Sequence, residues 1–166
     1  MSQLNWYAVY TRPRWEKRVA ERLTQKGIVN YCPLNRVLRQ WHDRKKLVLE
    51  PLFTMYVFVR IDPKSQLKVL QTNGVINFVS WLGKPAVIKD EEIHLIQQFL
   101  QEHINIHVEK ADLRLDDEVM ISDGPLLSYK GKIVEIKNKT VKLLIPSLKM
   151  ALYAEVDKLS IIKANR

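Results

Sequence analysis

The sequence predicts an α+β protein in which an N-terminal α/β sandwich is followed by a small C-terminal five-stranded β-barrel. Residues 1–102 alternate strand-like and helix-like patterns, which is typical of a mostly antiparallel sheet with flanking helices. Residues 116–166 change to short alternating strands between turn residues, and such strands bury a core by curling into a barrel. Residues 103–115 are polar and poorly periodic, so we expect a linker there.

Composition indicates a soluble protein of a reducing compartment. The 166 residues are 46% hydrophobic and 27% charged, as in a soluble globular protein. No apolar run is long enough to span a membrane and the N-terminus lacks a signal pattern, so we expect a cytoplasmic protein with no membrane contact. The single cysteine, Cys32, cannot form an internal disulfide, which fits a reducing compartment.

Positive charge is concentrated at the N-terminus. The net charge is +9, and residues 1–46 alone hold eleven Lys and Arg against three acidic residues. A clustered basic surface predicts binding to a polyanion, and nucleic acid is the commonest polyanion in a cytoplasm. The alternative is a solvated surface that only keeps the protein soluble.

The first expected elements are a strand and a helix. Asn5–Tyr10 has a strand pattern, and a helix over Pro13–Lys26 is predicted because Thr11 suits a helix cap and Gly27 a C-terminal stop. One helix face carries apolar residues every four positions, namely Trp15, Val19 and Leu23. The next face carries arginines at the same spacing, Arg14, Arg18 and Arg22, which form a basic ridge. Together with Arg12, which precedes the helix, they are the candidate nucleic-acid-binding residues.

The following segments complete the sandwich. Pro33 interrupts a second strand over Ile28–Leu38, and Leu47–Leu49 is expected to re-enter the sheet after a basic hairpin tip at residues 39–46. Trp41 in that tip is either solvated or available to stack on a nucleobase. Further along we expect a short helix, a strand and a second helix at Pro63–Thr72, Gly74–Leu82 and Glu91–Gln101.

Five short strands are predicted in the C-terminal domain. Turn residues such as Gly124 and Asn138 separate them. The strands are Val119–Ile121, Lys132–Lys137, Thr140–Ile145, Met150–Val156 and Leu159–Ile162.

Glu50–Asp62 is the strand around which the sandwich is organised. The segment is opened by Pro51 and is rich in aromatic and β-branched residues. Alternation predicts Val57, Val59 and Ile61 on one face and Tyr56, Phe58 and Arg60 on the other. Either both faces are covered, or Tyr56 and Phe58 line a groove for a partner protein.

Four parts of the chain together resemble the NusG family of transcription elongation factors. Trp6–Tyr10 with its basic helix is similar to the start of the family's N-terminal domain, and Pro51–Val59 to its signature strand. Gly74–Val79 is similar to the family's Gly-Val-x-x-Phe-Val segment, and Asp117–Leu126 with Tyr129–Glu135 to its C-terminal KOW motif. The four parts stand in the family's order and at its spacing. The resemblance therefore does not depend on any single motif, and it covers almost the whole chain.

Details of the resemblance point to a specialised branch of the family. Glu50–Phe53 and Arg12–Trp15 resemble the RfaH-like factors and the UpxY antiterminators of polysaccharide loci. Housekeeping members usually carry Pro-Gly where this chain has Thr54 and Met55, so a stiffer backbone is expected there.

The resemblance implies partners for both domains. In the family an aromatic-lined groove grips the coiled-coil clamp helices of RNA polymerase, and the matching or neighbouring residues here are Tyr56, Phe58, Tyr10 and Phe53. Binding there would suppress pausing or termination, and the basic ridge would face upstream or non-template DNA of the transcription bubble. The KOW barrel recruits the termination factor Rho or a ribosomal protein, and the candidates here, unless they only cap the barrel, are Leu126, Leu127 and Tyr129.

The sequence offers little for an enzyme, a metal or a cofactor. His103 and His107 have the i, i+4 spacing of metal ligands but lack a third ligand, and Cys32 lacks a base partner. Two other hypotheses stay open. One is a ribosome- or RNA-associated KOW protein that does not act on polymerase, which the weak charge of the last third disfavours. The other is a paralog that antagonises another NusG-type factor at the same polymerase site.

Overall fold

The computed structural model describes residues 3–110, 133–137 and 140–155 of the chain. The chain divides into two compact units. The first combines Met1–Leu34 with Pro51–Ile96, and the second combines Asn35–Glu50 with Gln97–Arg166. No helix in these described ranges is long and apolar enough to cross a membrane.

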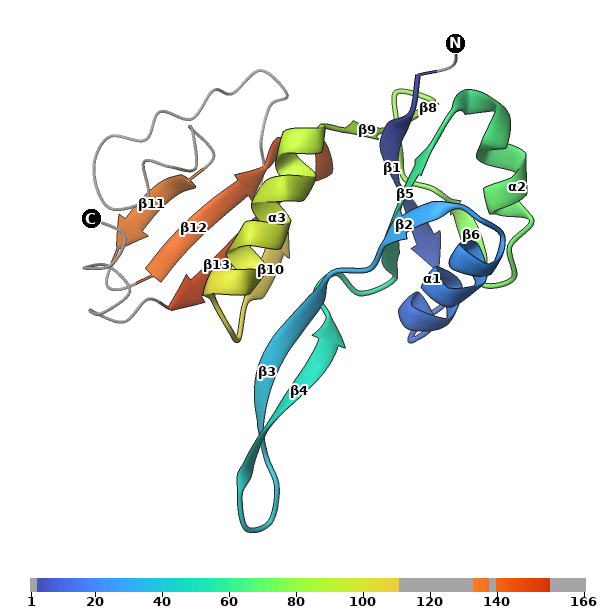
Figure 1. Cartoon of the computed structure of the whole chain (residues 1–166). Coiled ribbons are helices and arrows are strands. Elements are labelled where there is room, and N and C mark those ends of the chain that lie inside the picture. Colours follow the sequence, from blue (N-terminus) through green and yellow to red (C-terminus); the bar gives the residue numbers. More distant parts are fainter. Residues whose placement is uncertain (1–2, 111–132, 138–139, 156–166) are drawn as a thin grey trace. The chain divides into compact units, whose positions relative to one another are not determined.

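The first unit is built on an antiparallel sheet, as predicted. Its strands follow the order β2-β5-β1-β6, and a fifth short strand, β9, also pairs with β1 (Figure 1). In chain order they are β1 (Asn5–Thr11), β2 (Val29–Tyr31), β5 (Tyr56–Ile61), β6 (Val75–Phe78) and β9 (Val87–Ile88).

Two helices accompany this sheet, α1 (Glu16–Gln25) and α2 (Gln66–Leu70), the second preceded by a 3-10 turn at Pro63–Ser65. The core cluster takes Val19 and Leu23 from α1 and Val69 from α2, and joins them to inward-facing strand residues. Those strand residues include Tyr7, Val9, Val57, Val59 and Ile61.

The start of α1 differs from the prediction, whereas its end agrees. Thr11 does not cap the helix, because its N–H donates to Met55 O at 2.8 Å and its hydroxyl to Arg12 O at 3.0 Å. These bonds keep Thr11 in the sheet, and the helix begins five residues later. At the other end Gly27 has φ +74°, and Ile28 N–H donates to Leu23 O, the pattern of a Schellman stop.

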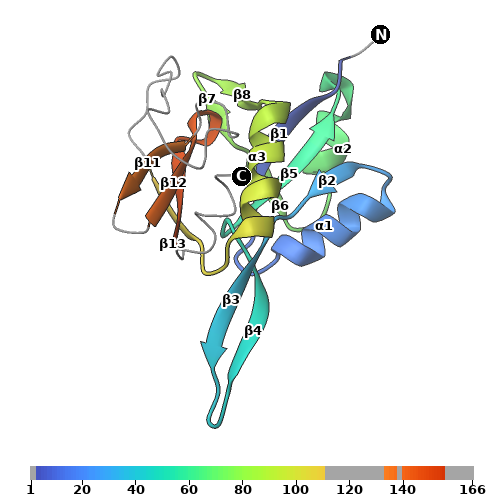
Figure 2. The ribbon, with the colours of Figure 1, turned by 60° about the vertical axis from the view of Figure 1, so that its left-hand side comes forward.

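The segment after β2 leaves the central sheet. Within the part of the chain that the structure describes, β3 (Leu34–Gln40) and β4 (Lys45–Pro51) pair only with each other. The expectation that Leu47–Leu49 re-enters the main sheet is therefore wrong (Figure 2). Leu52 N–H donates to Pro33 O at 2.8 Å where the two strands depart. Charged residues lie on both faces of the hairpin, which is why neither face can join a core.

A second, tighter hairpin joins β7 (Ser80–Trp81) to β8 (Lys84–Pro85). Its two turn residues, Leu82 and Gly83, both have positive φ, as a type I′ hairpin turn requires. The predicted strand over Gly74–Leu82 is therefore divided between β6 and this hairpin.

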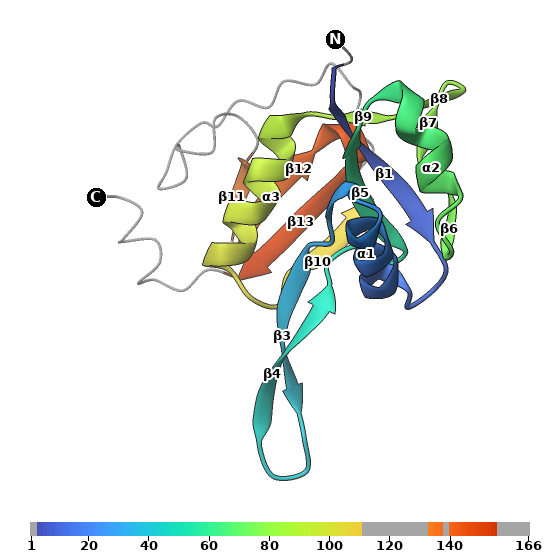
Figure 3. The ribbon, with the colours of Figure 1, turned by 45° about the vertical axis from the view of Figure 1, so that its right-hand side comes forward.

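The second unit contains a four-stranded antiparallel sheet in the order β10-β13-β12-β11 (Figure 3). β11 (Ile133–Lys137), β12 (Thr140–Ile145) and β13 (Met150–Glu155) confirm three of the predicted C-terminal strands. The predicted strands Val119–Ile121 and Leu159–Ile162 lie outside the described residues, so the closed barrel stays a prediction.

Two further elements complete this part of the chain. α3 (Asp90–Glu102) confirms the predicted helix within one residue and runs from the first unit into the second. β10 (His107–Lys110) pairs with β13, so part of the segment predicted as a linker forms a strand. The domain boundaries 1–102, 103–115 and 116–166 stay a prediction.

Candidate functional site

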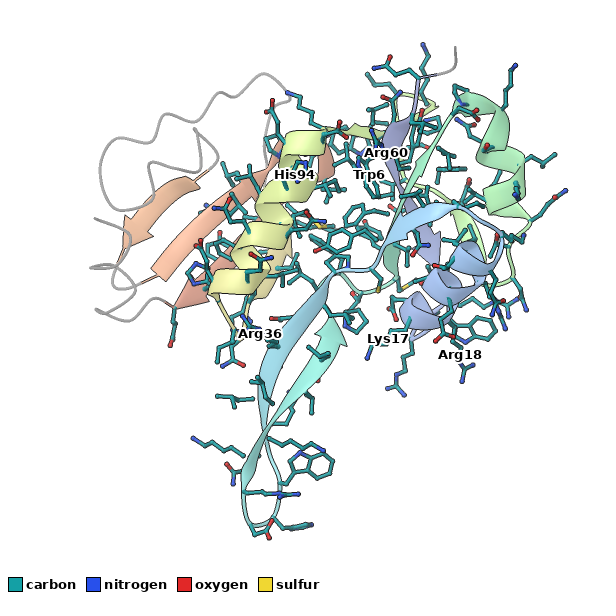
Figure 4. All side chains as sticks on the ribbon, viewed as in Figure 1. Trp6, Lys17, Arg18, Arg36, Arg60 and His94 are labelled. Atoms are coloured by element: carbon teal, nitrogen blue, oxygen red, sulfur yellow. The ribbon has the colours of Figure 1, made fainter. Side chains whose placement is uncertain are left out.

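The face of the central sheet opposite the helices is aromatic. In the antiparallel pair of β1 and β5, Tyr10 stands across from Tyr56 and Ala8 across from Phe58. Cross-strand partners share a face, and the intervening Val57 belongs to the core cluster on the other side. Trp6 and Arg60 form the next pair along this face (Figure 4).

Five rings on this side form what we call the aromatic face: Tyr10, Tyr31, Phe53, Tyr56 and Phe58. The Tyr10 and Tyr56 centroids lie 5.0 Å apart, and the Phe53 and Phe58 centroids 5.6 Å apart at nearly right angles. Phe53 also lies 6.4 Å from Tyr56, and Tyr31 stacks at 6.3 Å from Phe58. These separations lie in the range of favourable aromatic pairs.

The rings differ in exposure, and Phe58, which was expected to line the groove, is not accessible. Phe53 and Phe58 are buried, at 2% and 0% exposure, whereas Tyr10 and Tyr56 are half-buried. Strand alternation placed Phe58 correctly opposite the valines, but Tyr31 and Phe53 cover its ring. Phe53 and Phe58 therefore support the two tyrosines, which supply the accessible surface.

The two accessible tyrosines interact through their hydroxyl groups. Tyr56 Oη donates to Tyr10 Oη at 3.5 Å. Burial, followed by this hydrogen bond and the neighbouring Tyr10, raises the pKa of Tyr56 above its usual value. Tyr56 is therefore neutral at physiological pH, and the pair offers two apolar rings with a polar edge.

The turn before β5 is fixed by two hydrogen bonds. Met55 N–H donates to Glu16 Oε1 at 2.7 Å, and Met55 O accepts from Thr11 N–H. Met55 has φ +67°, a conformation that glycine reaches without strain and that costs other residues about 1–2 kcal/mol. Although this residue is methionine, its backbone has a conformation typical of glycine, and the bond to Glu16 of α1 stabilises it.

A second candidate surface surrounds Trp15. The guanidinium carbons of Arg12, Arg18 and Arg22 lie 5.2, 5.3 and 4.9 Å from the indole centroid. Each distance is within the range of a cation–π contact. We call these four residues the Trp15 cluster.

The arginines of the Trp15 cluster differ from the predicted ridge of Arg14, Arg18 and Arg22 at one position. Because α1 begins at Glu16, Arg14 lies outside the helix with φ +65°, and only Arg18 and Arg22 keep the four-residue spacing. Arg14 is exposed, while Arg12 takes the third place on the indole. Trp15, predicted as core, is half-buried and packs against the core with one side only.

The loop before β6 holds the Trp15 cluster in place. Arg12 N–H donates to Gly74 O at 2.9 Å, and Arg22 Nη1 donates to Asn73 O at 3.1 Å. A Cβ on Gly74 would lie 2.7 Å from Trp15 Cε3 and 2.7 Å from Val19 Cγ2, so only glycine lets this backbone approach the indole.

The remaining candidate residues offer no catalytic or metal chemistry. Among the described residues, no group of three or more His, Cys, Asp and Glu could hold a metal ion. Burial and the nearby Glu16 raise the pKa of Cys32 to about 11, with Lys17 opposing, so the thiol is protonated at neutral pH. The predicted KOW contacts lie outside the described residues; these are Leu126, Leu127 and Tyr129.

Sequence reasoning missed two members of these surfaces. Tyr31 carries no signal of its own, because the pairing of β2 with β5 depends on a register that the sequence does not reveal. Trp15 matches the spacing of Val19 and Leu23, which predicts a core position. The neighbouring arginines at positions 12, 18 and 22 were the available signal for a cation–π role.

Comparison with known proteins supplies the family. The family model described as "Transcription termination factor nusG" matches residues 4–97, more than half of the chain. The chain belongs to the NusG family. NusG-family proteins are non-enzymatic transcription factors, which agrees with the absence of catalytic chemistry predicted from the sequence.

Several NusG-family members are similar over most of their length. The chain is 28% identical over 167 residues to the transcription termination/antitermination protein NusG of Streptococcus pyogenes serotype M3, covering 92% of each chain. It is 28% identical to the protein of the same name from Halalkalibacterium halodurans, covering 84% of this chain and 85% of the other. A solved structure of Thermotoga maritima NusG matches the fold with a TM-score of 0.50 at 22% identity, covering 96% of each chain.

Proposed function

We propose that this chain is a transcription elongation and antitermination factor whose first unit binds the clamp helices of RNA polymerase through Tyr10 and Tyr56. The observation that carries the proposal is the pair of accessible tyrosines, with rings 5.0 Å apart, on a sheet face backed by buried phenylalanines. The similar proteins named for transcription termination and antitermination support the choice of polymerase as partner.

Physical chemistry favours such a pair as an anchor for a helix. Helix recognition needs a few rigid apolar side chains with a polar edge. The tyrosines are held by ring contacts and by their own hydroxyl bond, so little conformational entropy is lost on binding. Arg60 is exposed on the same face and can add a polar contact at the rim.

The Trp15 cluster is proposed to contact upstream or non-template DNA of the transcription bubble. Stacking on the indole orients the guanidinium groups of Arg12 and Arg18 while leaving donors available for phosphate oxygens. The exposed Arg14 can add a further phosphate contact. Such contacts position a protein on DNA without reading its sequence.

Three finer points complete the proposal. Polymerase binding would suppress pausing or termination, and a KOW domain would recruit Rho or a ribosomal protein through Leu126, Leu127 and Tyr129. We also propose that the chain is a specialised paralog of the RfaH/UpxY-like type. The basis for all three is the sequence resemblance described above.

In vitro transcription with purified polymerase tests the proposal. We expect the full-length protein to shorten pauses or increase read-through at a terminator, and Tyr10→Ala/Tyr56→Ala to lose most of this effect. The matched control is Tyr10→Phe/Tyr56→Phe, which keeps both rings and removes only the hydroxyl bond. A folded double-alanine variant with full activity would overturn the assignment. A native protein that has no effect alone but blocks the effect of another NusG-type factor would indicate an antagonist.

A further inference from the structure

The β3–β4 hairpin is a strongly charged ribbon that the proposed function does not use. Its tip is closed by a hydrogen bond from Trp41 N–H to Arg44 O at 2.7 Å. The Trp41 side chain is 53% exposed at this tip, although tryptophan is one of the side chains that proteins usually bury. An exposed indole on a closed turn offers a flat ring for stacking.

Cationic side chains surround the indole. Arg44, Lys45 and Lys46 are all exposed, and Asp43 is the single acidic residue between Gln40 and Leu47. Lower on the hairpin, Arg39 and Glu50 neutralise one another through two hydrogen bonds of 2.8 Å. The uncompensated positive charge is therefore concentrated at the tip.

The hairpin also exposes apolar side chains next to these charges. Leu38, Leu47 and Leu49 are 43%, 46% and 52% exposed. A purely solubilising ribbon would not need leucine and tryptophan at its surface. A ligand that combines negative charge with flat apolar faces suits this combination, and an unpaired nucleic acid strand has both.

The base of the hairpin is clamped within the second unit. Arg36 Nη2 donates to three carbonyl oxygens around the end of α3, those of Leu100, Gln101 and His103, at 2.8, 3.0 and 3.3 Å (Figure 4). Asn35 exchanges two hydrogen bonds with the backbone of Ile106. These bonds orient the hairpin before a ligand arrives, which lowers the entropy cost of binding.

We propose that the β3–β4 hairpin is a binding arm for single-stranded DNA, with Trp41 stacking on an unpaired base and Arg44, Lys45 and Lys46 contacting phosphates. Stacking requires a base that is not paired, so the arm discriminates single strands from duplex. The choice of DNA rather than RNA rests on the proposed function, in which the chain works beside a melted duplex.

The test measures binding of the full chain to a fluorescently labelled 12-nucleotide oligothymidine by anisotropy. Trp41→Ala is expected to weaken binding about 5- to 150-fold, because one base no longer stacks on an aromatic ring, while Trp41→Phe keeps most of the affinity. Leu82→Ala is the matched control, since Leu82 is a 98% exposed apolar residue at the tip of the other hairpin. It should leave the affinity unchanged.

Two further measurements separate stacking from charge. On a 12-base-pair duplex, Trp41→Ala should change affinity less than twofold. Arg44→Gln/Lys45→Gln/Lys46→Gln should lower the salt slope of oligothymidine binding by about 0.7 for each phosphate that the variant no longer neutralises. Replacing three exposed lysines elsewhere, Lys64, Lys84 and Lys89, controls for the change in net charge.

Several outcomes would overturn the proposal. Wild-type oligothymidine affinity in Trp41→Ala, or an equally weakened affinity for duplex, would remove the stacking interaction. Dependence on Trp41 with oligouridine alone would make the ligand RNA rather than DNA. Polymerase binding by Trp41→Ala should stay at the wild-type level, so failure of this arm is distinguishable from failure of the tyrosine anchor.

Discussion

The aromatic face and the Trp15 cluster belong to the same unit, but the first is neutral and the second is positively charged. The first presents two neutral rings backed by buried phenylalanines, and the second presents three guanidinium groups on one indole. Burial-driven binding depends little on salt, whereas binding to phosphates weakens steeply as salt rises. Under the proposed function, one unit therefore binds protein and DNA through two surfaces of different chemistry.

The largest expected effect distinguishes support from contact within the aromatic face. Phe58→Ala should lower the free energy of unfolding by about 3–5 kcal/mol, because it empties a fully buried site beneath the tyrosines. Urea denaturation followed by circular dichroism measures it. Tyr56→Ala should cost clearly less stability, since that ring is half-exposed. Equal destabilisation by the two variants would contradict the division of roles.

The next effect tests the loop that holds the Trp15 cluster. Gly74→Ala should lower the free energy of unfolding by about 2–4 kcal/mol, because the new Cβ meets Trp15 and Val19 and the residue has φ +100°. Gly27→Ala is the matched control. Gly27 has φ +74°, but a Cβ added there would have no neighbouring atom within 4 Å, so only backbone strain of about 1 kcal/mol is expected. Similar destabilisation in both variants would show that the Trp15 indole can move to make room for the new Cβ at little cost in free energy.

A third effect sharpens the electrostatic side of the comparison. Arg12→Gln/Arg18→Gln/Arg22→Gln should flatten the salt dependence of binding to a melted-bubble DNA. The slope should fall by about 0.7 for each single-strand phosphate, or about 0.9 for each duplex phosphate, that the variant no longer neutralises. The free energy of unfolding should fall by at most about 1.5–3 kcal/mol, because three exposed cation–π interactions are lost and each contributes about 0.5–1 kcal/mol. The lysine triple variant at positions 64, 84 and 89 provides the charge control. An unchanged slope would remove the DNA role.

The smallest effect concerns alkaline pH. Burial raises the pKa of Cys32 to about 11 and that of Tyr31 to about 12, so both groups favour the neutral form in the folded protein. Their contributions to stability are complete below the unfolded-state pKa values, near 9 and 10, and disappear as the pH rises toward 11 and 12. Cys32→Ala should reduce the fall in unfolding free energy between about pH 9 and pH 11. If Cys32→Ala and the native protein lost stability equally over this pH range, burial would not raise the pKa of Cys32.

Local patterns predicted elements better than they predicted surfaces. The Gly27 stop, the helix at Asp90–Glu102 and three C-terminal strands follow from residue periodicity and turn chemistry, and these agree with the structure. The start of α1 could not be predicted in this way. A long-range bond from Thr11 to Met55 keeps Thr11 in the sheet, and no local signal carries that information.

The candidate sites show the same division. Strand alternation placed Tyr56 and Phe58 opposite the core valines, but the ring of Phe58 is also covered by Tyr31, which belongs to another strand. Likewise, the sequence identified Arg12, Arg18 and Arg22 as basic candidates, but it did not indicate that all three contact the Trp15 indole. Most residues of the two surfaces were predictable from the sequence, whereas the contacts among their side chains were not.

Polymerase affinity measured across a range of salt concentrations tests the central claim most directly. Tyr10→Ala/Tyr56→Ala should weaken binding to core polymerase by at least about tenfold at every salt concentration, as removal of a buried aromatic anchor predicts, without changing the salt slope. The Arg12→Gln/Arg18→Gln/Arg22→Gln variant should bind core polymerase like the native protein. Native affinity in a folded double-alanine variant would contradict the assignment of the tyrosine pair as the polymerase contact.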